Sequence, residues 1–314
     1  MSESPRPAAA RAGSWRTDSP AARRRRRREL AVHAVLFLAA FSAVAITVAI
    51  VLTLLIESSA FFRHVSLWDF LTDTQWTPLF ENPRYGILPL IAGTLTTSIV
   101  ALLVAIPLGT ITAIYLSEFA KPRVREIVKP ILELISGVPT VVFGYFALLF
   151  VTPLLQKIIP DLPGFNMLGP GIVIGIMIVP YVSSLSEDAM RAVPMHLREA
   201  SYGMGASRFQ TAVRVVMPAA LSGIVASYIL GISRAVGETM VVAIAAGQQP
   251  TLTFDPTEAA ATITAYIVQV AMGDLPHGSI GYQSIFAAGL TLFAITLLFN
   301  LIGHWIRKRF REAY

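Results

Sequence analysis

Cysteine is absent from the 314 residues, and charge is scarce, since only 14% of the chain is Asp, Glu, Lys or Arg. Without cysteine there is no disulfide framework, thiolate metal site or cysteine nucleophile. An ordinary soluble domain carries about 25% charged residues, so this chain has too little charge to cover a large soluble enzyme. Hydrophobic residues make up 54% of it. The composition excludes a soluble enzyme and indicates a membrane protein.

Patterns of catalytic and metal-binding residues are also missing. The five histidines are scattered, and no two of them have the spacing of a zinc site. The phosphate-binding loop G-x-x-x-x-G-K-[ST] does not occur, so the chain has no evident means of hydrolysing ATP itself. We therefore expect no catalytic residue, no metal site and no cofactor in this chain.

Long apolar runs are the main positive signal. A membrane helix needs about 20 mostly apolar residues to cross about 30 Å of hydrocarbon. Five charge-free runs meet this length, and a sixth is interrupted only by Arg234 and Glu238. The sequence predicts an all-α integral membrane protein whose domain, 30–310, has six transmembrane helices, over about 30–56, 87–117, 133–156, 166–188, 215–246 and 283–306.

Prolines inside these runs free backbone carbonyl groups and permit kinks. The four in question are Pro89, Pro107, Pro139 and Pro180. Irregular helices are tolerated in membranes where they line protein or water. The segment Gly137-Val138-Pro139 therefore either borders a translocation path or only shapes helix packing.

The distribution of basic residues sets the orientation. Six helices place both termini on one side, which then holds 21 Lys and Arg residues, against 3 on the other side. Positive charge is retained in the cytoplasm, so we expect both ends to be cytoplasmic. A cleaved secretory signal is the alternative, but the first apolar run reaches Ile56, whereas a signal has an apolar core of about 7–15 residues.

The N-terminal residues 1–29, rich in Ala, Arg, Pro and Ser, are predicted to be a disordered cytoplasmic tail. The block from Arg23 to Arg28 explains most of the net charge of +6. Beside a long apolar run, it is typical of a topology anchor that binds anionic lipid, not of a nucleic-acid-binding arm. The basic residues over 121–129 and after 306 are interpreted as further topology determinants.

Two outer loops stand out. The first, 57–85, is rich in aromatic residues, which suits anchoring at the membrane–water interface, with a docking surface as the alternative. The last, 247–283, carries Asp255, Glu258 and Asp274 without any Lys or Arg, and its pattern assigns it no role.

The fourth loop, 195–214, reads Glu199-Ala200-Ser201, three residues, Gly205, nine residues, then Val215-Val216-Met217-Pro218. This spacing resembles the EAA loop of ABC importer permeases, E-A-A, three residues, Gly, nine residues, I-x-L-P. We expect a short helix up to about 204, a sharp reversal at Gly205 and a second short helix. An ordinary connecting loop is the alternative.

In that family the loop lies in a groove of the ATPase subunit and transmits its closure to the membrane helices. By this resemblance the coupling residues are Met195, Leu197, Glu199, Ala200 and Gly205.

Arg234 and Glu238 lie within a predicted span. Burying an ionised side chain at the centre of a bilayer costs about 2.5–3.5 kcal/mol. At spacing i, i+4 the two side chains project from one face of a helix and can pair. We expect them to line the substrate path, where Arg234 meets an anion with its fixed donor fork. A neutral pair that only locks helices together is the alternative.

Three segments narrow the resemblance. Ser233 to Met240, Gly86 to Leu95 and Ser136 to Gly144 all resemble the PstC family of phosphate ABC transporter permeases, type I binding-protein-dependent importers, and the likeness runs over about 30–310. The resemblance implies phosphate import across the bacterial cell membrane. It also implies three protein partners, namely a second permease (PstA-like), an ATPase dimer (PstB-like) that binds ATP and Mg²⁺, and an extracytoplasmic phosphate-binding protein (PstS-like).

Three rival functions remain open. A sulfate or molybdate importer keeps the architecture and changes the cargo. A self-sufficient secondary transporter would relay protons through Arg234 and Glu238, but it leaves the spacing of the fourth loop unexplained. A membrane sensor without transport is expected to lack an intramembrane charged pair.

Overall fold

The computed structural model describes residues 20–78, 80–273, 275–276 and 278–309, and every regular element in these ranges is helical. The β-type backbone pairings among these residues are two isolated bridges, Trp76 with Tyr85 and Gly247 with Ala260. The predicted all-α class is confirmed. Residues 1–19 of the predicted tail lie outside the described residues, and the chain is already helical from Pro20.

The chain divides into two units, Met1–Thr53 and Leu54–Tyr314. The described part of the first unit belongs to α1 (Pro20–Phe61). Its apolar side chains are exposed on every side, with Leu36 and Phe37 more than 60% exposed. A helix that is apolar all round is stable in hydrocarbon or against other apolar helices.

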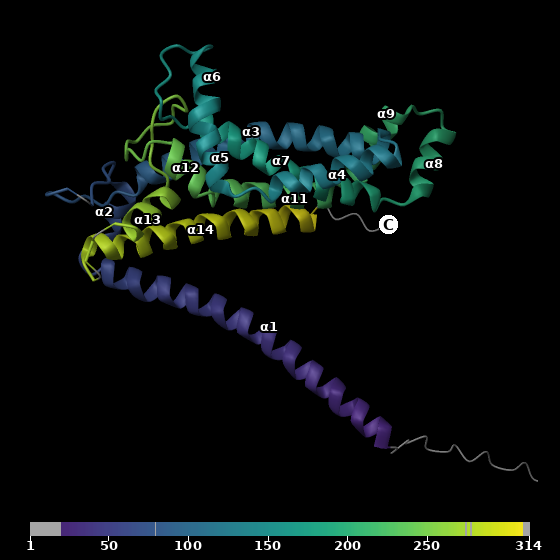
Figure 1. Ribbon diagram of the computed structural model, residues 1–314, viewed down its shortest axis with the longest axis horizontal. Helices are drawn as coiled ribbons and strands as arrows, with labels where there is room; N and C mark the ends of the chain where they lie inside the picture. Colours follow the sequence, from purple (N-terminus) through teal and green to yellow (C-terminus); the bar gives the residue numbers. More distant parts are fainter. Residues whose placement is uncertain (1–19, 79, 274, 277, 310–314) are drawn as a thin grey trace, which may run out of the picture. The chain divides into compact units, whose positions relative to one another are not determined.

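The centre of the second unit is the close packing of α3 (Leu88–Ile114) against α7 (Leu168–Arg191), which run side by side in Figure 1. Glycines permit this approach. A Cβ atom on Gly175 would lie 2.7 Å from the backbone oxygen of Ala101, and one on Gly171 would lie 2.6 Å from the Val100 side chain. Small residues serve this purpose at helix interfaces in membranes.

Two further long helices complete the bundle. The helix α11 (Leu221–Val236) packs on α7, and α14 (Ile280–Arg309) packs on α11. The short helices α8 (Met195–Gly203) and α9 (Arg208–Thr211) lie at one end of the bundle in Figure 1. At the other end lie α2 (Leu67–Thr72), α12 (Met240–Ala245) and α13 (Ile263–Ala271).

The remaining elements are α4 (Pro122–Ser136), α5 (Thr140–Phe146), α6 (Thr152–Gln156), α10 (Met217–Ala219) and the π-helical turns η1 (Tyr115–Phe119), η2 (Ala147–Val151) and η3 (Ala212–Val216). Among the described residues, four helical segments are long and apolar enough to cross a membrane, namely Arg24–Phe61, Leu88–Phe119, Leu168–Arg191 and Ile280–Arg309.

Two broken pairs of helices bring the number of candidate spans to six when each pair counts as one. The axis turns by 87° between Pro122–Ser136 and Thr140–Gln156, and by 74° between Arg208–Ala219 and Leu221–Val236. The predicted spans over 133–156 and 215–246 are therefore not straight helices. The predicted basic loop over 121–129 lies almost wholly on α4.

Of the four prolines predicted to kink helices, Pro139 alone sits at such a break, where it precedes the first residue of α5. Pro89 lies in the first turn of α3, where the missing N–H costs nothing. Pro107 and Pro180 lie inside α3 and α7, each of which continues as one helix.

The prediction for the aromatic loop is wrong for three residues. Phe61, Phe70 and Trp76 are at most 2% exposed and pack edge-on in a cluster with Tyr85 and Tyr266. Aromatic rings gain more from such packing than from an interface, because edge-to-face pairs add to the burial of their area.

The predicted outer loop over 247–283 contains a helix, α13, which packs into the same cluster. Asp274, predicted as part of the acidic loop, lies outside the described residues.

Candidate functional site

The segment that holds Arg234 and Glu238 is a break between two helices. The helix α11 ends at Val236, and α12 begins at Met240. Arg234 is therefore in the last turn of α11, and Glu238 is in the connection. Discontinuous helices of this kind occur in membranes where they line protein or a water-filled cavity.

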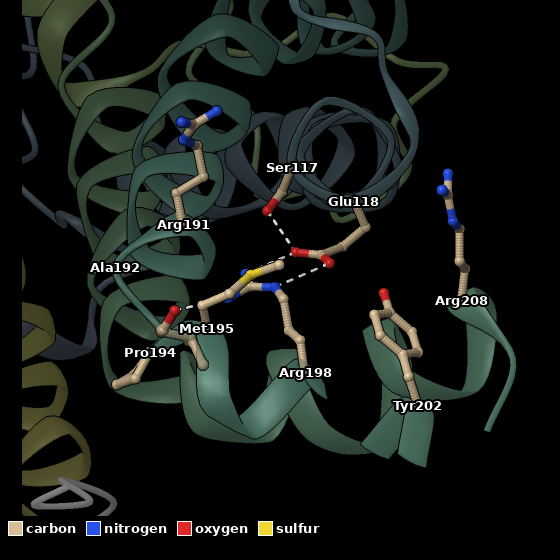
Figure 2. A pocket seen from close by; sticks show the side chains of 10 residues that line it. Ser117, Glu118, Arg191, Ala192, Pro194, Met195, Arg198, Tyr202 and Arg208 are labelled. Atoms are coloured by element: carbon tan, nitrogen blue, oxygen red, sulfur yellow. Dashed lines mark hydrogen bonds and ion pairs between the residues drawn. The ribbon is translucent and has the colours of Figure 1, made fainter. Parts of the chain in front are cut away.

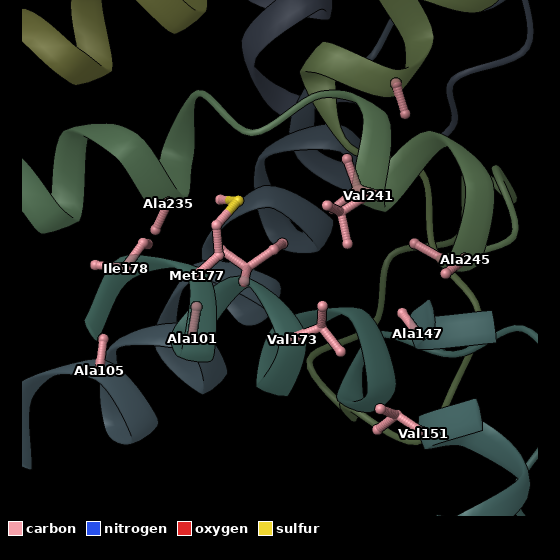
Figure 3. Close-up of a cluster of buried hydrophobic side chains, with 14 of the residues drawn as sticks. Ala101, Ala105, Ala147, Val151, Val173, Met177, Ile178, Ala235, Val241 and Ala245 are labelled. Atoms are coloured by element: carbon pink, nitrogen blue, oxygen red, sulfur yellow. The ribbon is translucent and has the colours of Figure 1, made fainter. Parts of the chain in front are cut away.

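Packing on both sides holds this break in place (Figure 3). Ala235 on α11 and Val241 and Ala245 on α12 all enter one buried apolar cluster with side chains of α3 and α7. On its other side α12 meets α5, where a Cβ atom on Gly144 would lie 2.8 Å from the side chain of Ile244. The break between α11 and α12 is thus held on both sides by packing in the core.

Glu238 is 7% exposed. Its backbone carbonyl and its carboxylate each accept a hydrogen bond from a neighbouring helix. Its backbone carbonyl accepts a hydrogen bond of 2.6 Å from the hydroxyl of Thr264 on α13. Its carboxylate Oε1 accepts a long bond of 3.4 Å from the N–H of Val241, in the first turn of α12. The hydroxyl of Thr94 on α3 in turn accepts a bond from the N–H of Ile263. The break is fixed to α3 by way of α13.

The expected pairing of Arg234 with Glu238 is wrong. No ion pair joins the two side chains in the described ranges, because α11 ends between them and they do not share a helical face. The Arg234 guanidinium carbon instead lies 4.5 Å from the centroid of the Tyr181 ring on α7. Its Nε atom is buried and makes no hydrogen bond.

The Arg234 charge is thus held by an aromatic ring and not by a carboxylate. A cation over an aromatic ring gains about 0.5–2 kcal/mol. The two parallel charge-assisted hydrogen bonds that an oxyanion accepts from a guanidinium are stronger. The arrangement leaves the donors of Arg234 available to a further anionic group.

The second predicted site, the loop over 195–214, has the geometry expected from its sequence. The helix α8 ends at Gly203, Gly205 takes a left-handed backbone with φ +83°, and α9 begins after Ser207. The Ser207 hydroxyl accepts from the N–H of Gln210, whose side chain accepts from the N–H of Ser207. This reciprocal cap fixes the start of α9.

The predicted coupling residues on α8 divide into two groups. Met195, Glu199 and Ala200 are exposed, whereas Leu197 is partly buried against the apolar cluster at the ends of α3, α7 and α11. One face of α8 is therefore anchored, and the other is open.

Sequence reasoning missed Arg198, between Leu197 and Glu199. Its side chain is 10% exposed and forms a two-point ion pair with Glu118 of η1, with Nη2–Oε1 at 2.9 Å and Nε–Oε2 at 3.2 Å. It also donates to the carbonyls of Met190, at 2.8 Å, and Val193, at 2.6 Å. One signal was visible in the sequence, since Glu118 is a lone acid at the end of a long apolar run.

A cavity of about 640 Å³ opens beside this pair, between α8, η1 and the end of α7 (Figure 2). Arg191, Tyr202 and Arg208 also line it. In Figure 2 the Glu118 and Arg198 side chains point toward each other across it.

A second group of charges joins α4 to the same end of α7. Glu187, fully buried, forms ion pairs with Arg125 at 2.7 Å, Lys129 at 3.0 Å and Arg191 at 3.7 Å. Lys129 also pairs with Asp188 at 2.7 Å. Arg125 and Lys129, interpreted from sequence as topology determinants, thus also bind two helices together.

Known proteins are similar to this chain over most of its length. The family described as "Binding-protein-dependent transport system inner membrane component" matches residues 105–312. A probable ABC transporter permease protein, YqgH of Bacillus subtilis, is 35% identical over 78% of this chain and 79% of its own length. The phosphate transport system permease protein PstC of Mesorhizobium japonicum is 33% identical over 77% of this chain and 79% of its own length.

Solved structures of ABC importers share the fold. A chain of a bacterial transporter that imports alginate aligns over 92% of this chain and 100% of its own, with TM-score 0.64 and 18% identity. A chain of the MetNI methionine transporter aligns over 72% of this chain and 95% of its own, with TM-score 0.52 and 18% identity.

Proposed function

This chain belongs to the family of binding-protein-dependent transport system inner membrane components, and we propose that it is the permease subunit of an ATP-driven phosphate importer. Relatives named as phosphate permeases support the cargo. The observation that carries the proposal is Arg234, a guanidinium in the last turn of α11 that lies against an aromatic ring and forms no ion pair among the described residues.

Phosphate is a compact oxyanion with two or more acceptor oxygens, which matches the planar donor fork of arginine. As the anion passes, the Arg234 side chain moves partly away from the Tyr181 ring and donates hydrogen bonds to the anion. Glu238, in the break beyond, opposes a second negative charge and keeps the anion from binding too tightly. Arg234 and Glu238 are thus the residues of the substrate path.

The exposed apolar side chains of the loop over 195–214 support a cytoplasmic partner. Met195 on α8, Met204 just after it and Phe209 on α9 are 61%, 89% and 64% exposed, which is unusual for a loop that meets only water. We place the ATPase dimer there, with its bound ATP and Mg²⁺, and place both termini in the cytoplasm. A second permease completes the path, and an extracytoplasmic phosphate-binding protein delivers the anion.

Reconstitution in lipid vesicles tests the proposal. The chain is expressed with the second permease and ATPase of its system, co-purified and inserted into vesicles with the loaded binding protein. ATP is expected to drive uptake of labelled phosphate that excess sulfate or molybdate does not compete with. Competition by either anion would mean that the transporter also binds that anion and that phosphate is not its specific cargo. Uptake by this chain alone, driven by a proton gradient, would replace the proposal by a secondary transporter.

A further inference from the structure

Three elements meet at the Arg198 side chain. It extends from α8, pairs at two points with Glu118 of η1, and donates to two carbonyls at the end of α7, as the preceding distances show. Figure 2 shows the Arg198 side chain reaching from α8 to Glu118. We refer to this arrangement, Arg198 with Glu118, Met190 and Val193, as the Arg198 clasp.

The clasp resists rotation as well as separation. A two-point ion pair fixes the plane of the guanidinium relative to the carboxylate. The carbonyls of Met190 and Val193 lie at and just beyond the end of α7, where the helix carries partial negative charge. The Met190 carbonyl also accepts from the backbone N–H of Val193, at 3.2 Å. Because Arg198 and Glu118 are 10% and 5% exposed, little water competes for these bonds.

A second side-chain hydrogen bond of α8 stays within its own loop and does not reach the bundle. Ser201 and Thr211 share one hydroxyl–hydroxyl bond of 2.9 Å, and Thr211 belongs to α9 of the same loop. Leu197 adds apolar packing, which has no fixed direction. Among the polar side-chain contacts that the described residues of α8 make, those of Arg198 therefore carry a push on its open face to η1 and α7 with its direction preserved.

The helix α7 carries such a displacement toward the helix break. Tyr181, whose ring lies against Arg234, is on the same unbroken helix as Met190. Met190 is nine positions after Tyr181, a rise of about 14 Å at 1.5 Å per residue. A movement of the clasp thus moves the ring that holds the arginine of the proposed path.

We propose that Arg198 is a positioning residue that makes α8, η1 and the end of α7 one rigid body, and that the clasp stays closed while ATP hydrolysis moves it. The proposal rests on the proposed function, since it needs an ATPase that acts on α8.

The first experiment uses the complete transporter with its partners in vesicles. Its readout is the ratio of ATP hydrolysis with the loaded binding protein to hydrolysis without it, a ratio that does not depend on the amount of folded protein. Arg198→Lys and Glu118→Gln are each expected to lower this ratio at least fivefold, because the signal of the bound binding protein then loses its directed path from the membrane helices to α8. Phosphate uptake is expected to fall with it.

The matched control is Arg123→Gln on α4. Arg123 is exposed and has no ion pair among the described residues, so the ratio is expected to stay at the wild-type value. If the Arg198 and Glu118 variants keep that value as well, the clasp does not carry the coupling and the proposal is wrong.

The second experiment uses the absence of cysteine. In Glu118→Cys/Arg198→Cys the two introduced thiols are the only thiols of this chain, and a short bifunctional thiol reagent joins them across the space left by the shortened side chains. Before linking, the ratio is expected to be low. Linking is expected to restore at least half of the wild-type ratio and uptake, because the rigid body is re-formed. If linking leaves both low, the clasp must open during the cycle and the proposal fails.

The two proposals fail in different ways. If the wild-type complex imports sulfate or molybdate instead of phosphate, the cargo is wrong, and the same ratio is measured with the binding protein loaded with that anion. If the wild type imports phosphate and the clasp variants match Arg123→Gln, only the rigid link is wrong.

Discussion

Two arginines of this chain are removed from water in opposite ways. Arg198 is enclosed by a carboxylate and two carbonyls, so its donors are engaged. Arg234 lies against an aromatic ring, and its buried Nε has no acceptor. A satisfied charge holds structure together, whereas an unsatisfied charge in the membrane is tolerated for what binds there.

The largest effect on transport is expected at the unsatisfied arginine. Arg234→Gln removes the charge that strengthens hydrogen bonds to an anion, each worth about 1.5–3 kcal/mol. Phosphate uptake is expected to fall by about 100-fold, since each 1.4 kcal/mol is a factor of ten, while the complex still assembles. Uptake by vesicles and co-purification of the partners check this. Normal uptake would take Arg234 out of the path.

The largest effect on stability is expected at the satisfied arginine. Arg198→Met leaves Glu118 buried without its partner, which destabilises by about 3–5 kcal/mol. Arg234→Met gives up a ring contact but also removes an unpaired buried N–H, so its stability is expected to stay within about 1 kcal/mol of wild type. Thermal unfolding of the purified chain in detergent compares them. Equal losses would mean that the two arginines do not differ in the way described.

A smaller effect is expected at the ring that holds Arg234. Tyr181→Leu removes the cation–π contact of about 0.5–2 kcal/mol, so the guanidinium is less well placed and the half-saturating phosphate concentration rises several-fold. Tyr181→Phe keeps the ring and serves as the matched control. The two variants are compared by concentration-dependent uptake. Identical values for both would show that the ring does not position Arg234.

The smallest effect is expected at the turn of the loop over 195–214. Gly205 has φ +83°, and a Cβ there would meet no atom within 4 Å, so Gly205→Ala costs only backbone strain of about 1–2 kcal/mol. Gly203→Ala is equally unobstructed but lies in α8, where alanine is favoured by about 1 kcal/mol. Unfolding temperatures are expected to move in opposite directions. A shift of the same sign would contradict the assignment of strain to Gly205.

Local signals in the sequence predicted the backbone of the loop over 195–214, with its two short helices and the reversal between them. Gly205 reverses the chain because only glycine takes a left-handed backbone at no steric cost. The structure adds the cap of the second helix, which Ser207 forms with Gln210. Both effects act within a few residues. The apolar runs likewise predicted an all-α membrane fold, and the resemblance named the family.

Contacts between residues far apart in the sequence could not be predicted in the same way. Glu118 and Arg198 are 80 positions apart, and no pattern of spacing connects them. Arg234 and Glu238 misled in the other direction, because the i, i+4 rule holds only while the helix continues. Here α11 ends at Val236, with Gly237 as its cap. The break lets α12, which begins at Met240, pack against α5 and α7.

Composition and short-range patterns by themselves determined that this chain is helical, lies in a membrane and turns at Gly205, because apolar length, glycine conformation and helix capping depend on neighbours in the chain. Which charges are paired was decided only by the tertiary structure. Whether a buried arginine meets Glu118 or the Tyr181 ring depends on which helices lie side by side, and that follows from packing across the whole bundle.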